Sequence, residues 1–315
     1  MNHDDTIGIV QISDTHFRAG SGARSFVAHE PDEGLAAVLA DAADAIADAA
    51  LVVATGDLAD LGEPGAYERL GTALDALPTP VYCLGGNHDR HDPMQACLPR
   101  PNVHVEPAVR VGNWLMLLLD TNAHGREATD AGDGTYRDLD DRVHRAAQPG
   151  LTPVEEQRAR AVLTATEAEH VFLWLHQPPL PQTAPDTDSY RELIQLVRDF
   201  PKIRAIGGGH LHGDLSGEFE GRPVYVCPSS FMSIDMPNGR FDGPGYRTYR
   251  LHPDGRVETE VHTVPGALTD AMRGASLPPF LSDMMTGRIT GRELNALSDE
   301  EFEARYGERR PLSQA

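Results

Sequence analysis

The sequence predicts an α/β or α+β fold, and three observations lead to this prediction. From residue 7 to about residue 264, short apolar runs alternate with polar or helix-like stretches, which is the pattern of strands joined by crossover connections. Several of these runs end directly in polar residues, as strands of an open sheet do at the edge where ligands bind. The chain has 315 residues, 40% of them hydrophobic, and can therefore bury a full core.

Five apolar runs are expected to form strands that deliver polar side chains to one edge of a sheet. In chain order they are Ile7–Ile12, Leu51–Thr55, Val81–Leu84, 171–175 and 203–206. The polar residues just beyond their ends are Asp14 and His16, Asp57, Asn87 and His88, His176, and His210 and His212. A strand fixes the position of such residues while the following loop leaves them exposed. We therefore expect them to lie close together.

Helices and further strands complete the predicted domain. Residues 31–50 and 66–77 carry apolar side chains with a helical period that suits packing on a sheet. A second set of strands is expected at 222–227, 246–251 and 257–264, and a strong turn signal, His252-Pro253-Asp254-Gly255, joins the last two.

Two segments stand apart from this pattern. Residues 122–152 are polar and long for a plain connection, and such loops are usually functional lids or disordered. After Pro265 a helical tail is expected, with a helix start at Ser298-Asp299-Glu300-Glu301. The predicted organisation is a catalytic domain over residues 1–264 and a helical appendage over 265–315. The appendage either makes oligomer contacts, covers the pocket, or is an ordinary terminal helix.

Composition narrows the classes of partner and compartment. The formal net charge of −21 argues against general binding to nucleic-acid polymers or anionic membranes, which depends on Lys and Arg neutralising phosphates. No apolar run approaches the roughly 20 residues that span a bilayer, and the N-terminus is polar and acidic. Cys83, Cys97 and Cys227 show no disulfide pattern. The expectation is a cytoplasmic protein, and the acidic composition does not exclude a small phosphorylated ligand.

The polar residues at the strand ends are informative when they are taken together and in their order along the chain. A single Asp-x-His or His-x-His occurs often by chance, and a lone histidine is more often structural than a ligand. Here five motifs follow one another in order: Asp14-Thr15-His16, Gly56-Asp57-Leu58-Ala59-Asp60, Gly86-Asn87-His88-Asp89, His176, and Gly209-His210-Leu211-His212. Together they resemble the calcineurin-like metallophosphoesterases, over about residues 7–230. The stretch 56–67 and the Gly86–Asp89 motif look most like the bacterial class III cyclic-nucleotide phosphodiesterases and their glycerophosphodiesterase relatives.

The resemblance implies a fold and a metal site. The fold would be a four-layer αββα sandwich of two mixed β-sheets flanked by helices. Asp14, His16 and His212 would hold one metal, Asn87, His176 and His210 would hold the other, and Asp57 would bridge both. A mixed oxygen and imidazole ligand set suits two transition-metal ions such as Mn, Fe, Zn or Co rather than Ca. One bridging carboxylate can hold two metals about 3.5 to 4 Å apart.

Two further residues have predicted catalytic roles. Through the resemblance, His88 is a proton donor or charge stabiliser at the leaving oxygen, with a structural histidine as the alternative. Asp60 is expected to accept a hydrogen bond from His88 and so fix its orientation. We expect Asp89 to have a structural role, and among the other histidines only His91 and His124 are considered near the site.

The predicted function is hydrolysis of a small-molecule phosphodiester, such as a 3',5'-cyclic nucleotide or a glycerophosphodiester, by attack of a hydroxide that bridges two metals. A phosphomonoesterase or nucleotide pyrophosphatase on the same site, and a catalytically silent metal-binding module, are the alternatives. The substrate, the metal pair and the possibility of a homo-oligomer are left open by the sequence.

Overall fold

Two six-stranded mixed sheets form the centre of the computed structural model. The structure describes residues 6–20, 30–121, 135–137, 143–145, 150–181, 183, 190–264, 275–285, 288–289 and 297–307. The first sheet has the strand order β16-β15-β1-β2-β3-β4, and the second has the order β11-β12-β10-β9-β6-β5. Within each sheet the central strands are parallel, and antiparallel strands lie at one or both edges.

The strands of the first sheet come from both ends of the chain. They are β1 (Ile7–Ile12), β2 (Leu51–Thr55), β3 (Val81–Leu84), β4 (Val103–His104), β15 (Gly245–Leu251) and β16 (Val257–Thr263). The second sheet contains β5 (Ala108–Val111), β6 (Trp114–Leu118), β9 (His170–Trp174), β10 (Ile203–Gly208), β11 (Leu215–Phe219) and β12 (Arg222–Val226). The predicted strands are confirmed with shifts of one or two residues at their ends.

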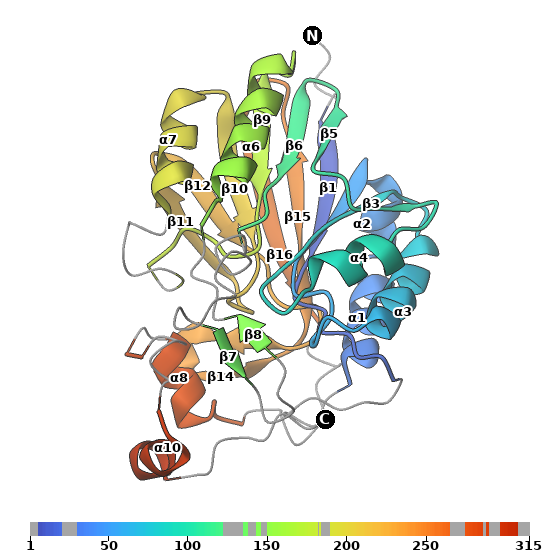
Figure 1. Ribbon diagram of the computed structural model, residues 1–315. Coiled ribbons are helices and arrows are strands. Elements are labelled where there is room, and N and C mark those ends of the chain that lie inside the picture. The colour runs from blue at the N-terminus through green and yellow to red at the C-terminus, as the bar shows by residue number, and fades with distance from the viewer. Residues whose placement is uncertain are drawn as a thin grey trace.

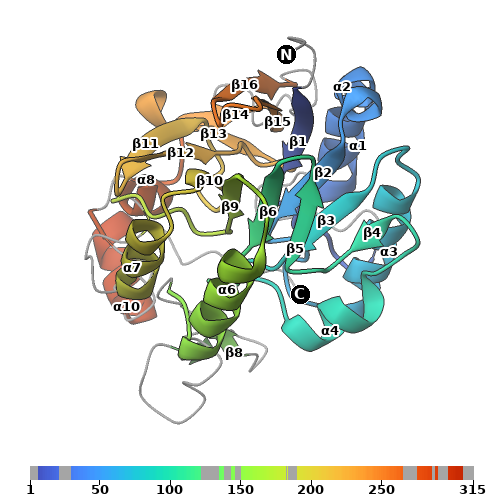
Figure 2. The same cartoon turned by 90° about the horizontal axis from the view of Figure 1, so that it is seen from above.

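Helices cover the outer face of each sheet, so that the layers follow the order α, β, β, α (Figures 1 and 2). The first sheet is covered by α1 (Pro31–Asp41), α2 (Ala43–Asp48), α3 (Pro64–Asp75) and α4 (His91–Cys97). The second sheet is covered by α6 (Pro153–Ala165) and α7 (Arg191–Asp199). The predicted four-layer sandwich is confirmed. The single helix expected over 31–50 is divided at Ala42, which ends α1 and begins α2.

Each central strand is buried on both faces because it lies between a helical layer and the other sheet. In β1, Ile9 faces the core between the sheets, while Val10 faces the core under the helices. This explains why the strands read as continuous apolar runs rather than as alternating ones. The core between the sheets includes the stacked rings of Phe172 and Trp174, with Tyr249 edge-on to both.

A buried glutamine joins the two sheets. Gln11 Nε2 donates to Thr55 Oγ1 at 2.8 Å and to the carbonyl of Gly208, on the other sheet, at 2.9 Å. Its Oε1 accepts a hydrogen bond from the Tyr249 hydroxyl at 2.6 Å. Because every polar atom of the side chain has a partner, this buried amide fixes the sheets against each other near the carboxyl ends of β1, β2 and β10.

The C-terminal residues pack against a small hairpin at one end of the sheets. The hairpin pairs β13 (Ser233–Asp235) with β14 (Arg240–Asp242), and α8 (Pro279–Met285) lies beside it (Figure 1). The predicted helix start is confirmed: α10 (Asp299–Tyr306) begins with a capping box between Ser298 and Glu301. Residues 265–274 and 308–315 lie outside the described residues, and the domain boundary at 264 stays a prediction.

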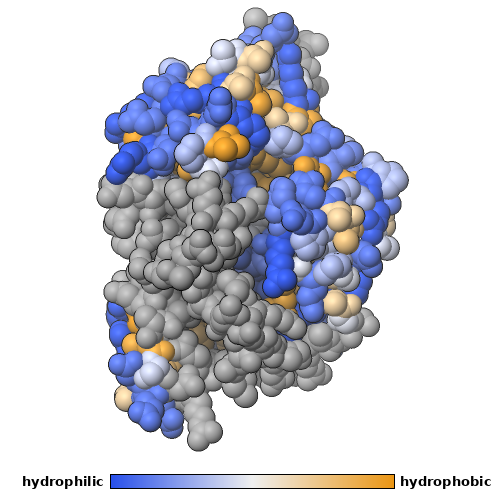
Figure 3. Space-filling view, in the orientation of Figure 1, coloured by the Kyte–Doolittle hydropathy of each residue, from blue (hydrophilic) through white to orange (hydrophobic). Residues whose placement is uncertain are grey.

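The long polar segment contains a second short hairpin, β7 (Thr135–Arg137) with β8 (Val143–Arg145). The rest of 122–149 lies outside the described residues, and with it the predicted position of His124. The three cysteines are free thiols. On the face drawn in Figure 3, the described side chains are mainly hydrophilic, with small separate apolar areas. No helix in the described ranges is long and apolar enough to cross a membrane.

Candidate metal centre

The structure brings the predicted site residues together at the carboxyl ends of the central strands. Asp14, His16 and His212 form one group whose potential ligand atoms all lie within 4.8 Å of one another, and Asp57, His176 and His210 form a second such group. These two groups follow the division implied by the motifs. A third group, which contains His16, Asp60 and His88, lies beside the first. Which of these atoms binds a metal remains a prediction.

The backbone is held in an unusual conformation at most of these positions. Among the described residues, six that are not glycine have a positive φ, and five of them are Asp14, His16, Asp57, His210 and His212. Such angles cost free energy for side chains with a Cβ, and they cluster at functional sites where the surrounding structure enforces them. Here they turn successive side chains inward immediately after β1, β2 and β10.

Glycines allow the loops to approach one another closely. A Cβ atom on Gly86 would lie 2.2 Å from Asp57 Oδ1, and one on Gly209 would lie 2.5 Å from Asp14 Oδ2. Gly207 and Gly208, which precede His210 closely, belong to β10, where a Cβ on Gly207 would lie 2.5 Å from the Trp174 ring. The positive φ values of His210 and His212, rather than those glycines, orient the two imidazoles.

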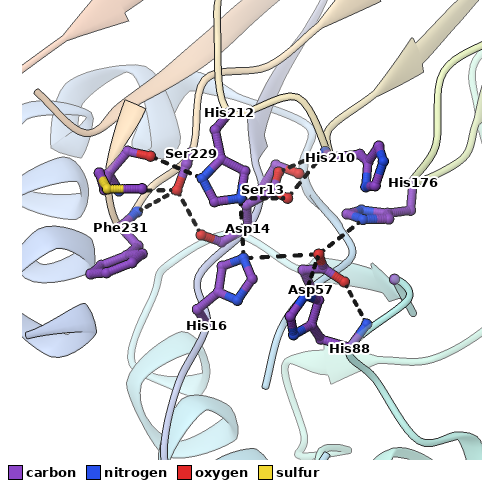
Figure 4. Close-up of polar contacts among 12 residues, drawn as sticks. Ser13, Asp14, His16, Asp57, His88, His176, His210, His212, Ser229 and Phe231 are labelled. Atoms are coloured by element: carbon purple, nitrogen blue, oxygen red, sulfur yellow. Dashed lines mark hydrogen bonds and ion pairs between the residues drawn. The ribbon is translucent and has the colours of Figure 1, made fainter. Parts of the chain in front are cut away.

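Three imidazoles are held through Nδ1 and direct Nε2 toward the centre of the cluster (Figure 4). His176 Nδ1 donates to the Thr55 carbonyl at 2.8 Å, and His212 Nδ1 donates to the Met232 carbonyl at 3.1 Å. His16 Nδ1 donates to the Asp60 carboxylate at 3.3 Å. Such contacts fix the tautomer and leave the Nε2 lone pair free to bind a metal.

His16 and His212 form the most informative contact of the first group. Their Nε2 atoms lie 3.1 Å apart. Because both Nδ1 atoms carry the proton, both Nε2 atoms present lone pairs, which repel unless a cation or an added proton lies between them. Asp14 Oδ1 lies 3.4 Å from His212 Nε2 and completes this arrangement of donor atoms. These atoms form a set that suits a borderline transition metal.

Asp57 lies between the two groups. Its Oδ2 is 3.1 Å from His176 Nε2 in the second group and 3.8 Å from His16 Nε2 in the first. Its other oxygen, Oδ1, accepts a hydrogen bond from the His88 backbone amide at 2.9 Å. Burial would raise the pKa of Asp57, but His176, His88 and His16 hold it well below its ordinary value. The carboxylate is therefore ionised and positioned where a bridging ligand is expected.

Asn87 and His210 complete the second group. Asn87 Oδ1 lies 3.1 Å from His176 Nε2. The His210 backbone amide donates to both oxygens of Asp14, at 3.1 and 3.0 Å, and so links the two groups. Burial, and then the neighbouring His176, lower the pKa of His210 to about 4. A neutral imidazole is the form that binds metals.

His88 faces the cluster from its more open side. Its Nδ1 lies 2.9 Å from the Asp60 backbone carbonyl and 3.3 Å from the Asp60 carboxylate, while Nε2 lies 4.0 Å from Asp57 Oδ2. Its side chain is 34% exposed, so the ring is partly open to a bound molecule. The sequence predicted a hydrogen bond from His88 to Asp60. The backbone carbonyl of Asp60 forms a shorter contact with Nδ1 than its carboxylate does. Since a carbonyl only accepts, Nδ1 carries a proton.

Three supporting residues were not assigned to the site from the sequence. Arg18 Nη1 donates to Asp60 Oδ2 at 2.6 Å. Ser229 Oγ donates to the Asp14 carbonyl at 2.8 Å, and Ser230 Oγ accepts from the Ser13 amide at 3.4 Å. The two serines follow β12 directly, so the strand-end criterion that located the other residues also applies to them.

Asp89 has the structural role expected for it. Its carboxylate accepts hydrogen bonds from the amides of Leu58, Ala59 and Gly86 and from the Tyr67 hydroxyl, at 2.7 to 3.0 Å. It thereby ties the loop after β2 to the loop after β3. His91, the other histidine considered near the site, is an exposed residue at the start of α4 and takes part in none of the three groups.

Comparison with known proteins agrees with this geometry. The family model described as Calcineurin-like phosphoesterase matches residues 7–214, a range that contains all nine predicted site residues. The chain belongs to the calcineurin-like phosphoesterase family. The predicted resemblance and the predicted class of enzyme, a metal-dependent phosphoesterase, are thus confirmed.

Several bacterial relatives resemble the chain over most of its length. The 3',5'-cyclic adenosine monophosphate phosphodiesterase CpdA of Pseudomonas aeruginosa is 26% identical over 83% of this chain and 91% of the relative. The protein of the same name from Escherichia coli K12 is 27% identical over 81% and 89%. A crystal structure of a dimetal phosphatase from Danio rerio aligns with a TM-score of 0.54 at 17% identity, covering 82% of this chain and 98% of that one. This structural likeness supports the fold.

Proposed function

We propose that this member of the calcineurin-like phosphoesterase family is a phosphodiesterase that holds two transition-metal ions and hydrolyses a small diester such as a 3',5'-cyclic nucleotide. The position of Asp57 carries this proposal. Its Oδ2 lies within 4 Å of imidazole nitrogens from both groups of potential ligands, at 3.1 Å from His176 and 3.8 Å from His16. One ionised carboxylate between two sets of imidazole nitrogens suits a pair of divalent cations.

The proposed ligands follow the two groups. Asp14, His16 and His212 hold one ion, and Asn87, His176 and His210 hold the other. When bound, the metal pair activates a water molecule and stabilises the developing charge on the phosphoryl oxygens. Only two ionised carboxylates, Asp14 and Asp57, belong to this ligand set, so a site that contains two divalent cations keeps a net positive charge toward a phosphate.

His88 is proposed to donate a proton to the departing oxygen. Its Nδ1 is held by the Asp60 carbonyl, and Nε2 faces the cluster from the accessible side. Burial lowers the pKa of His88, but in the metal-free protein the carboxylates of Asp57 and Asp60 raise it to about 10. The contacts with Asp60 keep the ring oriented, as a proton donor at the leaving oxygen requires.

A cyclic nucleotide is proposed as the substrate because relatives that match over 81% to 85% of the chain are named cyclic-nucleotide or cyclic adenosine monophosphate phosphodiesterases. The strongly acidic composition supports a small diester over a nucleic-acid polymer. Free thiols at all three cysteines support the proposed cytoplasmic location. A role of the C-terminal segment in a homo-oligomer stays a proposal.

A substrate panel tests this function. The metal-loaded protein is assayed with 3',5'-cyclic AMP, glycerophosphocholine, bis-p-nitrophenyl phosphate and p-nitrophenyl phosphate, and metal content is measured in parallel. We expect 3',5'-cyclic AMP to give a higher kcat/KM than glycerophosphocholine, and bis-p-nitrophenyl phosphate to give a higher kcat/KM than p-nitrophenyl phosphate. A clear preference for p-nitrophenyl phosphate over every diester contradicts the proposal and indicates a phosphomonoesterase. A metal-loaded protein that hydrolyses none of them indicates a silent metal-binding module.

A further inference from the structure

A second pocket lies at the end of the sandwich away from the metal centre. It is formed by the first residues of β10 and β12 and by the turn that joins β15 to β16. The proposed metal ligands follow the carboxyl end of β10, whereas this pocket includes Ile203 and Arg204 at its amino end. A strand of six residues spans roughly 20 Å, so the two sites are separate.

The pocket is rich in arginine although the protein is strongly acidic. Its volume is about 340 Å³, and it is lined by Arg204, Arg222 and Arg256 together with Tyr225 and neighbouring backbone. The protein has a formal net charge of −21, with 48 acidic residues for 27 basic ones. Only Arg256 has a carboxylate partner among the described residues, Glu258, so Arg204 and Arg222 give the pocket a positive potential that the composition as a whole does not predict.

Two of these arginines contact only backbone oxygens within the described part of the chain. Arg204 Nε donates to the Gly255 carbonyl at 3.4 Å, and Arg222 Nη1 donates to the Gly221 carbonyl at 3.2 Å. Arg222 Nε is buried and has no hydrogen-bond partner there. Neither guanidinium forms an ion pair with a described carboxylate. Arg204 is exposed and Arg222 is half-buried, so both guanidinium groups can be reached by an anion from solvent, and an unpaired guanidinium is a strong donor to such an anion.

Other arginines at this end of the molecule do have carboxylate partners. Arg256 pairs with Glu258, and its Nη2 also lies 3.1 Å from His252 Nδ1. Arg198, on α7, forms a two-pronged ion pair with Glu220, at 2.6 and 3.0 Å. The missing charge partners of Arg204 and Arg222 are therefore a local property of the pocket rather than of this end of the molecule.

We propose that this pocket, the arginine pocket, binds a small phosphorylated compound, with its phosphate held by Arg204 and Arg222. A guanidinium presents paired N–H donors that match two oxygens of a phosphate group, and two such groups suit a dianionic phosphate monoester. The volume is at the lower end of small-molecule sites, which leaves room for a compact organic part beside the ring of Tyr225. This site is independent of the proposed reaction.

The test uses inorganic phosphate as the probe and the metal-loaded, full-length protein. Isothermal titration calorimetry is carried out on the wild type, on the double variant Arg204→Gln with Arg222→Gln, and on the control Arg110→Gln with Arg288→Gln. The control removes two charges from exposed positions whose partners, Glu167 and Asp283, do not line the pocket. We expect two binding events in the wild type and the control, one at the metal centre and one in the arginine pocket.

In the double variant only the event at the metal centre should remain, because losing a charged hydrogen-bond donor weakens binding by about tenfold or more per arginine. Unchanged titrations in all three proteins overturn the proposal. A crystal of the wild type soaked in tungstate, a heavy analogue of phosphate, provides a test that does not depend on folding of a variant. Anomalous density between Arg204 and Arg222 supports the proposal, and density at the metal centre alone rejects it.

Discussion

Arg18 and Asp60 form a 2.6 Å ion pair at the edge of the candidate metal centre. The same carboxylate lies 3.3 Å from His16 Nδ1 and 3.3 Å from His88 Nδ1. Asp60 therefore connects the proposed metal ligand His16 with the proposed proton donor His88. The ion pair with Arg18 fixes the position of the Asp60 carboxylate. Partners of this kind orient a ligand and set its basicity, and their loss typically reduces metal affinity or activity by about 10- to 100-fold.

Arg18→Ala is accordingly expected to lower kcat/KM for a diester by roughly tenfold, with little change in the overall fold. Arg18→Lys should recover part of the activity, because it restores a positive charge near Asp60 without the planar guanidinium. The measurement is kcat/KM together with metal content for both variants. Arg110→Ala, an exposed arginine far along the chain, serves as the control. Equal activity of Arg18→Ala and wild type contradicts a positioning role.

Removal of Asp57 should affect both metal positions together. Its Oδ2 contacts the imidazoles of both groups, so Asp57→Ala is expected to lose most of both ions. Asp48→Ala removes an exposed carboxylate at the end of α2 and should keep full occupancy. Elemental analysis after exhaustive dialysis measures both variants. Full metal content in Asp57→Ala would show that this carboxylate does not bridge the site.

Stability of the metal-free protein should reach a maximum near pH 6.5. Despite burial, neighbouring carboxylates raise the pKa of His88 to about 10 and that of His176 to about 9, so the stability these groups contribute is present below the ordinary value of 6.5. It is lost as the pH rises through about 9 to 10. Burial lowers the pKa of His210 to about 4, so its contribution is lost as the pH falls from 6.5 toward 4.

Bound metals should make the stability rise rather than fall with pH above 6.5, because imidazole ligands must be neutral and metal binding releases their protons. Melting temperatures between pH 5 and 9, with a chelator and with added Mn²⁺, measure the difference. In the chelated protein, Tm should fall above pH 6.5, and His88→Gln should reduce that fall. A chelated wild type whose Tm rises steadily from pH 6.5 to 9 contradicts this expectation.

The sequence was most informative where strands end in polar residues. Parallel strands place their carboxyl ends at one edge, so the grouping of Asp14, Asp57 and His210 follows from the order of apolar runs and polar residues alone. The hairpin of β5 and β6 was not predicted, although Gly112 and Asn113 between two apolar runs form a hairpin signal. This run ends in no metal-binding motif, so the criterion of polar residues at strand ends does not apply to it.

Other features depend on contacts between residues far apart in the sequence. The partner of Arg18 lies 42 residues away, and Ser229 reaches Asp14 across 215 residues. Neither pairing follows from local periodicity. The division of the helix at Ala42 was equally hidden, because apolar residues continue with a helical period on both sides of the break, with Val38 and Leu39 before it and Ile46 after it. The arginine pocket also arises only when the β15–β16 turn meets the ends of β10 and β12.

The C-terminal segment should influence the metal centre through the β13–β14 hairpin. Leu277 is buried in a cluster with Phe231 and Met232, and the Leu277 amide donates to the Gly239 carbonyl at 2.9 Å. The Phe231 ring lies 6.1 Å from that of His16, and the Met232 carbonyl accepts the His212 Nδ1 proton. Loss of this packing should therefore loosen one wall of the site.

Truncation after Val264 tests this connection. We expect the shortened protein to keep its metals but to change its relative kcat/KM for 3',5'-cyclic AMP and bis-p-nitrophenyl phosphate by several-fold. Leu277→Ala, which leaves a cavity in the same cluster, should lower stability by about 2 to 4 kcal/mol and shift the ratio in the same direction. An unchanged substrate ratio and an unchanged mass in solution identify the segment as an ordinary terminal helix.

If His88 is the proton donor, the effect of replacing it should depend on the leaving group of the substrate. General acid catalysis is typically worth about 10²- to 10⁴-fold when the departing oxygen is a poor leaving group such as an alkoxide. p-Nitrophenolate is already stable as an anion and needs little protonation. His88→Ala should consequently lose far more activity on 3',5'-cyclic AMP than on bis-p-nitrophenyl phosphate. His91→Ala, an exposed histidine three residues away, should leave both rates unchanged.

The same comparison separates a proton donor from the alternatives. A histidine that only supports the metal ligands would lower both rates together when replaced, because misplaced or missing metals affect every substrate. The geometry favours the donor role, since Nδ1 is held by the Asp60 carbonyl and Nε2 of this partly exposed ring lies 4.0 Å from Asp57 Oδ2. Values of kcat/KM for both substrates, measured together with metal content, distinguish these two roles of His88. Equal losses at full metal occupancy assign His88 to positioning or charge stabilisation instead.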